Sequence, residues 1–349
     1  MAYLAQDCVD KPLRSFSIGF TENGGNGDEL PYASDMARFL GTNHEEYILC
    51  GKEIASEFEK IVWHLDQPSI DGINTYYVSK TANKHVKVAL TGLGGDELFG
   101  GYPHFNRFVR QRNRSGLIVK ALRKMHENLP TQVPGRVRLA LEFEVSTIEE
   151  RHAMIRRVFT EQEKRRIMNQ DLIMLEKGLY PISEYYKMLI GKGKDPVQEV
   201  SYVEMYGYMN RMLLRDADAM SMAHSLELRV PFLDHELVEY VYAMPAELKV
   251  GVDGTKIALK ELVKGKLPDW ALKREKRGFD LPMTEWLSRG ALRAKAEEVL
   301  SSPEASKTLS TYGIEEAVKA LRRGEFYAKP WSLVVLVSWL SMNGVVLNG

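Results

Sequence analysis

The chain has 349 residues, of which 44% are hydrophobic and 27% charged, and its 47 basic residues balance its 47 acidic residues. This composition is typical of a soluble globular protein with a sizeable core and excludes a wholly disordered chain. The zero net charge provides no overall field that would attract nucleic acid or an anionic membrane, so we predict neither as a partner.

Cysteine usage and hydropathy indicate where the protein resides. The two cysteines, Cys8 and Cys50, have no metal-ligand spacing and no secretory signal ahead of them. This pattern is typical of reduced thiols, so we predict a cytoplasmic protein without a structural disulfide. The most apolar stretch, residues 331–347, is shorter than the roughly 20 residues that span a bilayer. We therefore expect a buried C-terminal helix there.

The first hundred residues alternate between strand and helix patterns. Residues 15–20 have apolar side chains at every second position, as a strand requires. Residues 29–40 and 54–65 carry apolar residues at helical spacing, and residues 86–90 have the pattern of a short buried strand. This order predicts an α/β fold with a parallel sheet flanked by helices, in which ligands bind at the carboxyl ends of the strands.

After about Tyr102 the strand patterns stop. Residues 200–214, 236–243 and 256–264 have helical patterns, and prolines punctuate them. We therefore predict a mostly helical C-terminal part. Residues 107–124 are rich in arginine and lysine but lack interleaved stacking aromatics, which favours a solvated helix face over a nucleic-acid surface.

The strongest motif is residues 90–102, Leu-Thr-Gly-Leu-Gly-Gly-Asp-Glu-Leu-Phe-Gly-Gly-Tyr. Three glycines in four positions follow the strand, so the backbone can approach a ligand closely and present N–H groups to an anion. The two acids that follow can hold a divalent metal. A nucleotide phosphate site is built in this way. The alternative is a tight turn whose acids cap the next helix.

Residues 90–102 resemble the second nucleotide-site motif of the asparagine synthetases. Three other parts of the chain resemble the same family in the same order: residues 15–20, residues 64–68 with 74–76, and residues 220–234. The resemblance implies a C-terminal synthetase domain with a fold like that of the adenine nucleotide alpha hydrolases, of the PP-loop type. On this basis we expect residues 1–102 to be a truncated nucleotide-binding α/β part. We expect residues 103–349 to be the mainly helical remainder of the same domain.

The resemblance assigns roles around the nucleotide. The implied cofactor-binding residues are Ile18, Thr91, Gly92, Gly94 and Gly95. Ile18 would pack beside adenine, and Asp96 would act in catalysis as the magnesium ligand. Lys276 falls on the lysine of the family's late loop, whose compact ammonium stabilises charge on the phosphates as pyrophosphate leaves. Without the resemblance, Lys276 would be one surface lysine in a basic loop.

Other acids lie where the family holds the carboxylic acid to be activated. Asp71 and Asn74 either bind an amino or hydroxyl group of the substrate or satisfy turn backbone. Arg229 and Asp234 stand among core residues, so we expect them to lock the fold. Two further acids have no assigned role, Asp216 and Asp218.

The resemblance also implies the reaction. ATP, with magnesium, would activate a carboxylate as an acyl adenylate, and ammonia would then displace AMP to leave an amide. The implied partners are aspartate or an analogue, and ammonia or glutamine supplied by a separate glutaminase domain. The oligomeric state stays open, a homo-oligomer included.

Two departures from the family pattern qualify this expectation. Leu93 stands where many relatives carry an acid that is thought to assist ammonia attack. The Ser-Gly-Gly-x-Asp-Ser pyrophosphate loop does not occur in these 349 residues, nor does a cysteine-led glutaminase domain, and we expect both upstream of Met1. The chain alone is therefore expected to be inactive or impaired and to expose a sheet edge.

Three functions remain open at this point. The first is asparagine synthesis of the glutamine-hydrolysing type. The second is amidation of another carboxylate, such as a sugar acid, or ring closure as in the related β-lactam synthetases, which Leu93 favours. The third is a non-catalytic remnant that serves as a binding module, which the missing loop favours.

Overall fold

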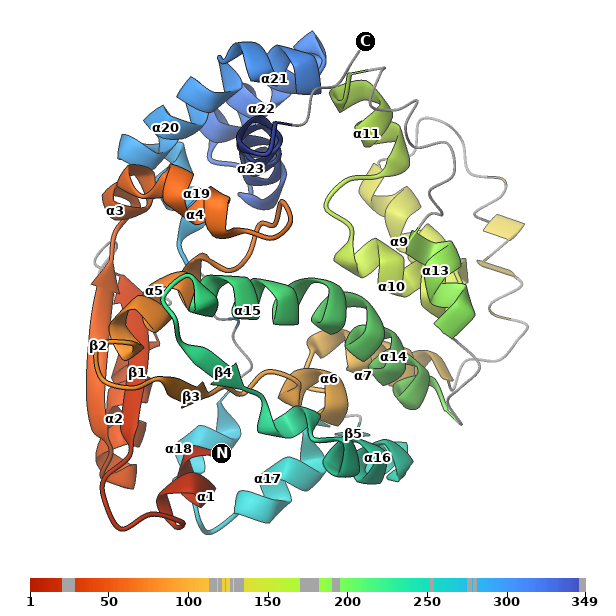
Figure 1. The fold of residues 1–349 in the computed structure, drawn as a ribbon. Helices are drawn as coiled ribbons and strands as arrows, with labels where there is room; N and C mark the ends of the chain where they lie inside the picture. Colours follow the sequence, from red (N-terminus) through yellow and green to blue (C-terminus); the bar gives the residue numbers. More distant parts are fainter. Residues whose placement is uncertain are drawn as a thin grey trace.

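The computed structural model is a mixed α/β protein that is mostly helical (Figure 1). It describes residues 1–20, 29–112, 118, 121–122, 124–125, 128, 135–169, 182–189, 195–251, 254–274, 278 and 281–344. The strands are β1 (Arg14–Phe20), β2 (Asn43–Leu49), β3 (Val88–Leu90), β4 (Glu227–Arg229), β5 (Val250–Gly251) and β6 (Gly254–Thr255).

The helices of the first half are α1 (Ala2–Gln6), α2 (Leu30–Leu40), α3 (Gly51–Ser56), α4 (Phe58–His64), α5 (Ile73–Ala82), α6 (Gly95–Phe99), α7 (Pro103–Arg112), α9 (Gly135–Val145), α10 (Ile148–Arg156) and α11 (Glu161–Ile167). The central ones are α13 (Ile182–Leu189), α14 (Pro196–Glu204), the π-helix η1 (Met205–Leu213), α15 (Leu214–Met222), the 3₁₀ turn η2 (Pro231–Leu233), α16 (His235–Ala243) and the 3₁₀ turn η3 (Ala246–Leu248). The last are α17 (Ile257–Val263), α18 (Asp269–Lys273), α19 (Met283–Ser288), α20 (Gly290–Leu300), α21 (Pro303–Thr308), α22 (Thr311–Arg323) and α23 (Ala328–Met342).

The strand predicted over residues 15–20 is present as β1, and it pairs in parallel with β2, a strand that was not predicted. β1 pairs with β2 in register from Arg14 opposite Asn43 to Phe20 opposite Leu49, and α2 forms part of the connection between them. Gly41 ends α2 in the left-handed conformation that a glycine adopts most easily after a helix. The helix expected over residues 54–65 is divided at Glu57 into α3 and α4.

β3 differs from its prediction in two respects. It pairs in parallel with β4, which lies in the part of the chain where no strand was expected. The sequence predicts one parallel sheet, whereas the described strands form two separate parallel pairs, β1–β2 and β3–β4, and the antiparallel hairpin β5–β6. β3 was also expected to be buried, whereas Val88 and Leu90 are 39% and 51% exposed.

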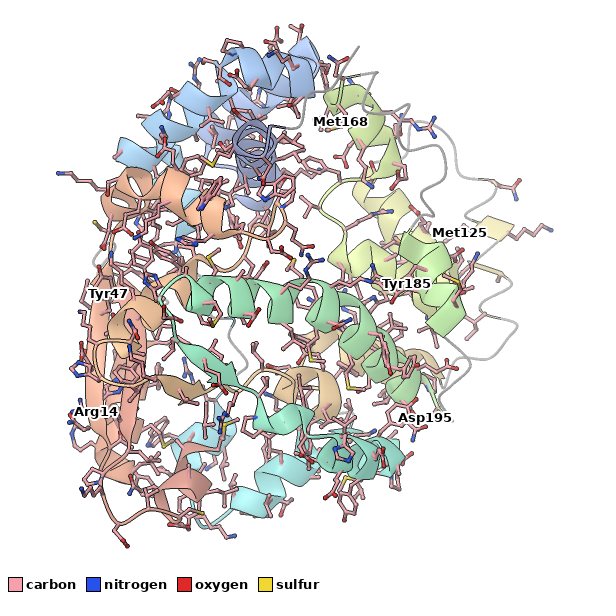
Figure 2. All side chains as sticks on the ribbon, in the orientation of Figure 1. Arg14, Tyr47, Met125, Met168, Tyr185 and Asp195 are labelled. Carbon is pink, nitrogen blue, oxygen red and sulfur yellow. The ribbon has the colours of Figure 1, made fainter. Side chains whose placement is uncertain are left out.

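The middle of the molecule is crossed by one long helical segment that runs through α14, η1 and α15 (Figure 1). The carboxylate of Asp195 starts it by accepting hydrogen bonds from Val197 N and Gln198 N, at 2.8 and 3.0 Å. At its other end α15 packs on α5, which in turn packs on β1 and β2. Figure 2 shows Asp195 and Tyr185 on the opposite side of the molecule from Arg14 and Tyr47.

The C-terminal helices α19 to α23 share a hydrophobic core with β1, β2, α3 and α4. The rings of Phe58 on α4 and Trp331 on α23 lie 5.6 Å apart, and both residues are buried. The predicted buried C-terminal helix is therefore confirmed in α23. Every helix within the described ranges is too short or too polar to cross a lipid bilayer.

Candidate functional site

The glycine-rich turn after β3 is held between a strand pair and a short helix. Thr91 N donates a hydrogen bond to Arg229 O at 2.9 Å, which extends the β3–β4 pairing, and α6 begins at Gly95. Gly94 has a φ of +87°, and a Cβ added there would lie 2.5 Å from the Leu233 side chain. A Cβ at Gly92 would meet no atom within 4 Å. One side of the turn is therefore packed, and the Gly92 side is open to a ligand.

Asp96 is paired with a lysine that the sequence did not reveal. Lys256 Nζ lies 2.7 Å from Asp96 Oδ1, and the two side chains are 27% and 19% exposed. Lys256 follows the β5–β6 hairpin with a φ of +55°, immediately before α17. A Cβ on Gly101 would overlap Asp96 Oδ1, so the second glycine of the Gly100-Gly101 pair makes room for the carboxylate.

Glu97, the other acid of the motif, points into the protein. It is buried and accepts a hydrogen bond from the Tyr102 hydroxyl at 2.6 Å. Its backbone oxygen also accepts one from the Ser201 hydroxyl on α14. Burial raises the pKa of Glu97, and the Tyr102 hydrogen bond opposes that rise. Glu97 therefore anchors the turn, and Asp96 is the more exposed of the two acids.

Ile18 lines a separate cavity of about 260 Å³ between β1, α2 and α18. The Arg274 guanidinium lies 4.0 Å from the centre of the Tyr32 ring and is paired with Glu29 at 2.6 Å. The rings of Tyr32 and Trp270 lie 6.1 Å apart at the same cavity. No residue of the glycine-rich turn lines it. The aromatic and guanidinium groups suit a flat heterocyclic ring.

Asp71 and Asn74 make local contacts at the start of α5. Asp71 Oδ1 accepts from Gly72 N at 2.9 Å, and Asn74 Oδ1 accepts from Thr75 N at 2.8 Å. Such bonds are those of turn-forming side chains. Of the two roles predicted for these residues, the bonds support the turn role.

Asp216, which had no assigned role, is a buried carboxyl beside this turn. It is 4% exposed and accepts a hydrogen bond from the Ser69 hydroxyl. Burial raises the pKa of Asp216 to about 7, Ser69 lowers it and the nearby charge of Asp71 raises it further. Asp216 is therefore a proton-exchanging group in the neutral range, next to the expected substrate region.

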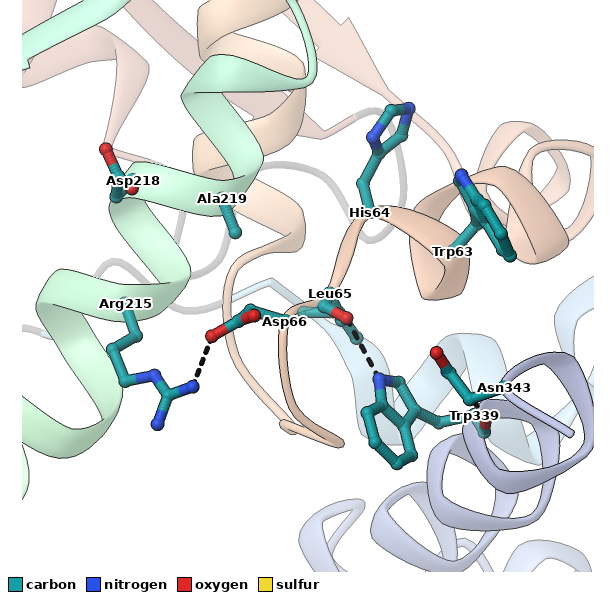
Figure 3. Close-up of a pocket in the computed structure, with 9 residues that line it drawn as sticks. All are labelled: Trp63, His64, Leu65, Asp66, Arg215, Asp218, Ala219, Trp339 and Asn343. Carbon is teal, nitrogen blue, oxygen red and sulfur yellow. Dashed lines mark hydrogen bonds and ion pairs between the residues drawn. The ribbon is translucent and has the colours of Figure 1, made fainter. Parts of the chain in front are cut away.

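The second cavity, of about 460 Å³, lies between α4, α15 and α23 (Figure 3). Arg215 and Asp66 form an ion pair across it, and Trp339 Nε1 donates to Leu65 O at 2.9 Å. The His64-Leu65-Asp66 part of the second resemblance segment therefore faces this cavity.

Arg229 and Asp234 are not among core residues. Arg229 is on the surface, where its Nε pairs with Glu227 at 2.8 Å, so the expectation of a buried lock is wrong for it. Three-residue β4 alternates its side chains, and Arg229 points away from the interior. Asp234 is exposed but does stabilise the fold, because it caps α16 through Glu236 N and Leu237 N at 3.1 and 3.3 Å.

The predicted site residues are therefore brought together only in part. One turn contains Thr91, Gly92, Gly94, Gly95 and Asp96. Ile18 lines a cavity to which none of these five residues contributes. Lys276 lies outside the described residues. Lys256 was not predicted as a site residue. The available signal was a lysine directly after the Gly-Thr pair at residues 254–255, twenty residues before Lys276.

The Asp96 carboxylate suits a magnesium ion that is also bound by water and by substrate phosphates. Within the described parts of the chain, no three His, Cys, Asp or Glu side chains are grouped to hold a metal by themselves. Magnesium seldom needs such a group, because it commonly binds through one or two carboxylates, water and substrate phosphates. The half-buried Asp96 carboxylate, near the open side of the turn at Gly92, is such a carboxylate.

Comparisons with known proteins match nearly the whole chain to one family. The asparagine synthase family matches residues 1–341. An "Asparagine synthetase [glutamine-hydrolyzing] 1" of Bacillus subtilis is 29% identical over 342 residues, 95% of this chain and 52% of the relative. A "Putative asparagine synthetase [glutamine-hydrolyzing]" of Mycobacterium tuberculosis is 28% identical over 94% of this chain and 50% of the relative.

A more distant relative has a different printed function. "Amidase chry2" of Gibberella zeae is 24% identical over 83% of this chain and 46% of the relative. The chain spans about half the length of the curated relatives it matches. The match over residues 1–341 shows that the chain belongs to the asparagine synthase family.

Proposed function

We propose that the chain is the synthetase part of an enzyme that uses ATP to convert a carboxylate into an amide through an acyl adenylate. The observation that carries this proposal is the turn after β3, where an open glycine backbone stands beside a carboxylate and an ammonium group 2.7 Å apart. Backbone N–H groups and a lysine suit phosphate oxygens, and the carboxylate suits their metal counter-ion.

The adenine end of the nucleotide is assigned to the cavity beside Ile18. Tyr32 and Trp270 provide ring surfaces there, and Arg274 provides a planar cation. This assignment requires the nucleotide to reach from that cavity to Gly92, so that the adenine and phosphate groups contact different strand pairs.

The reaction has two steps. An oxygen of the substrate carboxylate attacks the α-phosphorus of ATP, its bond to phosphorus forms, and pyrophosphate leaves with the electron pair. Ammonia then attacks the acyl carbon, loses a proton and displaces AMP. Negative charge grows on the pyrophosphate in the first step, where Lys256 and Lys276 provide opposing positive charge. Magnesium held by Asp96 would neutralise phosphate charge.

The acceptor is assigned to the region of Asp71 and Asn74. Because both side chains already make turn bonds, the proposal concerns where the acceptor lies and assigns neither side chain a contact with it. Asp216 is buried behind the same turn, and the pKa of about 7 lets this carboxyl take up a proton near neutral pH. Aspartate is the first acceptor to test, as in the asparagine synthetases. Ammonia would come from glutamine at a glutaminase domain, or directly.

A second acceptor class is favoured by one residue. Leu93 places an apolar side chain in the turn where many relatives carry an acid, which favours amidation of another carboxylate such as a sugar acid. A third possibility, a non-catalytic binding module, retains nucleotide affinity without turnover.

The test is acid-dependent pyrophosphate release from ATP, magnesium chloride and ammonium chloride, with a panel of carboxylic acids that includes aspartate and sugar acids. Release that depends on aspartate supports the proposal as stated. Release with a different acid supports the second acceptor class. ATP binding without release for any acid, in a protein extended through a Ser-Gly-Gly-x-Asp-Ser loop, contradicts the enzymatic proposal and supports the binding module.

A further inference from the structure

A cluster of charged side chains is buried where α7, α10 and α14 meet. Glu204, the last residue of α14, is 0% exposed. His104 Nε2 and His152 Nε2 lie 2.7 and 2.9 Å from the same Glu204 oxygen. The Arg156 guanidinium donates to both oxygens, at 2.9 Å to Oε1 and 2.8 Å to Oε2. One carboxylate therefore receives three cationic or polar groups in the interior.

The protonation of the cluster follows from these contacts. Burial alone would raise the pKa of Glu204, but His104, His152 and Arg156 outweigh it, and the pKa is lowered well below its ordinary value. Burial lowers the pKa of His104, which keeps its ring neutral at pH 7. The pair of Glu204 and Arg156 is therefore ionised, and replacing it with apolar residues would commonly cost no stability. Stability alone is a weak explanation for the cluster.

Arg156 connects this cluster to the glycine-rich turn. Its guanidinium lies 4.5 Å from the centre of the Tyr102 ring and 3.7 Å from that of Tyr208. The Tyr102 hydroxyl donates to buried Glu97 at 2.6 Å, and Glu97 directly follows Asp96. The contacts thus run from Glu204 through Arg156 and Tyr102 to the residue beside Asp96.

We propose that Arg156, held by Glu204, is a positioning residue for the nucleotide-binding turn: it fixes the Tyr102 ring so that the Tyr102 hydroxyl holds Glu97 and, through it, Asp96. A guanidinium fulfils this role because its planar face can stack on a ring while its edge binds a carboxylate with two hydrogen bonds. A lysine would keep the charge and lose both geometries. The inference rests on the proposed function, since it concerns the turn assigned to ATP.

The experiment is a double-mutant cycle read in ATP affinity. The variants are Tyr102→Phe, Arg156→Lys and the two combined, in the full 349-residue chain. The dissociation constant of ATP with magnesium chloride is measured by calorimetry at pH 7.5, and the melting temperature is measured alongside. Arg166→Lys is the control, because Arg166 also stacks on a tyrosine, 4.3 Å from the Tyr312 ring, but lies on α11 in a different part of the fold.

We expect each single variant to weaken ATP binding by on the order of tenfold, which is the size of effect that the loss of one buried hydrogen bond commonly has. The double variant should be about as weak as the weaker single variant, because both changes break one chain of contacts. The control should bind as the wild type does.

Four results would overturn the inference. Unchanged affinity in the variants would show that Arg156 only supports the fold, and so would lowered melting temperatures with normal affinity. Losses that multiply to about a hundredfold in the double variant would show two independent effects. Failure of the wild-type chain to bind ATP would contradict the proposed nucleotide site itself, and with it this inference.

Discussion

The buried carboxyl of Asp216 makes the stability of the protein depend on pH. Its native pKa of about 7 is above the ordinary value of 3.8, so between these values the native protein holds one more proton than the unfolded chain. The free energy of unfolding therefore falls as pH rises through this range. This shift in pKa corresponds to on the order of 4 kcal/mol of unfolding free energy. The protein has this stabilisation below pH 3.8 and has lost it once the pH is above 7.

Asp216→Asn tests this directly. Asparagine keeps an oxygen to accept the Ser69 hydrogen bond and carries no charge, so the variant should be more stable than the wild type at pH 8 and similar at pH 4. Urea unfolding at both pH values measures the difference. The control is Asp218→Asn, an exposed neighbour on α15, which should keep the wild-type pH dependence. Equal pH dependence in the Asp216→Asn variant and the wild type would refute the assignment.

Lys276 is expected to act in the adenylation step. In a protein that carries out the reaction, Lys276→Ala should slow pyrophosphate release by on the order of 100-fold and weaken ATP binding much less, because its charge matters most as pyrophosphate develops. Single-turnover rates and ATP dissociation constants separate the two effects. A normal rate would mean that Lys276 is only a surface charge.

At the scale of elements, the glycine-rich turn depends on close packing against η2. Gly94→Ala introduces a Cβ both at a positive φ and 2.5 Å from Leu233, so we expect it to destabilise the protein by on the order of 2–4 kcal/mol. Gly41→Ala is the matched control, since Gly41 has a φ of +67° but no atom within 4 Å of the new Cβ. It should cost only about 1 kcal/mol. Equal losses in denaturant unfolding would show that packing against Leu233 is unimportant.

Most of the predicted elements have a long, regular pattern, although the short strand β3 was also predicted and the seven-residue strand β2 was not. β1, α2, α16 and α23 have enough alternating or helical positions to identify them from sequence. β4 has only three residues, Glu227, Leu228 and Arg229, and its identity as a strand depends on pairing with β3, more than 130 residues earlier. No local pattern carries that information. The order of strand pairs was therefore predicted incorrectly.

The candidate site was predicted only in part from the sequence. The glycine spacing located the turn, because glycine conformations are local properties of the sequence. The Lys256 partner of Asp96 and the Arg156 contact with Tyr102 join residues that are 160 and 54 positions apart. Such contacts follow from tertiary packing, and the sequence contained no periodicity that would pair them.

At the scale of the whole molecule, β3 presents an open edge and an apolar face. Among the described strands it pairs only with β4, and its Val88 and Leu90 side chains, which share one face, are exposed. Open edges and exposed apolar side chains promote association between chains. We expect the chain to associate with rising concentration in sedimentation velocity, and Val88→Lys to reduce this association. Tyr240→Lys, at a 68% exposed residue on α16, is the control and should not reduce it. A wild-type chain that stays monomeric at all concentrations would contradict this expectation.

The central claim, that the turn beside Lys256 binds the phosphates of ATP, is tested most directly by one measurement. It is the calorimetric dissociation constant of ATP with magnesium chloride for the wild type, Lys256→Ala and Lys264→Ala, in which Lys264 is an exposed lysine at the end of the same helix, paired with Glu261 at 3.0 Å. Lys256→Ala removes positive charge and leaves Asp96 to repel the phosphates, so its affinity should fall at least about tenfold, with Lys264→Ala unchanged. Equal affinities in the three proteins, or no binding by the wild type, would contradict the account.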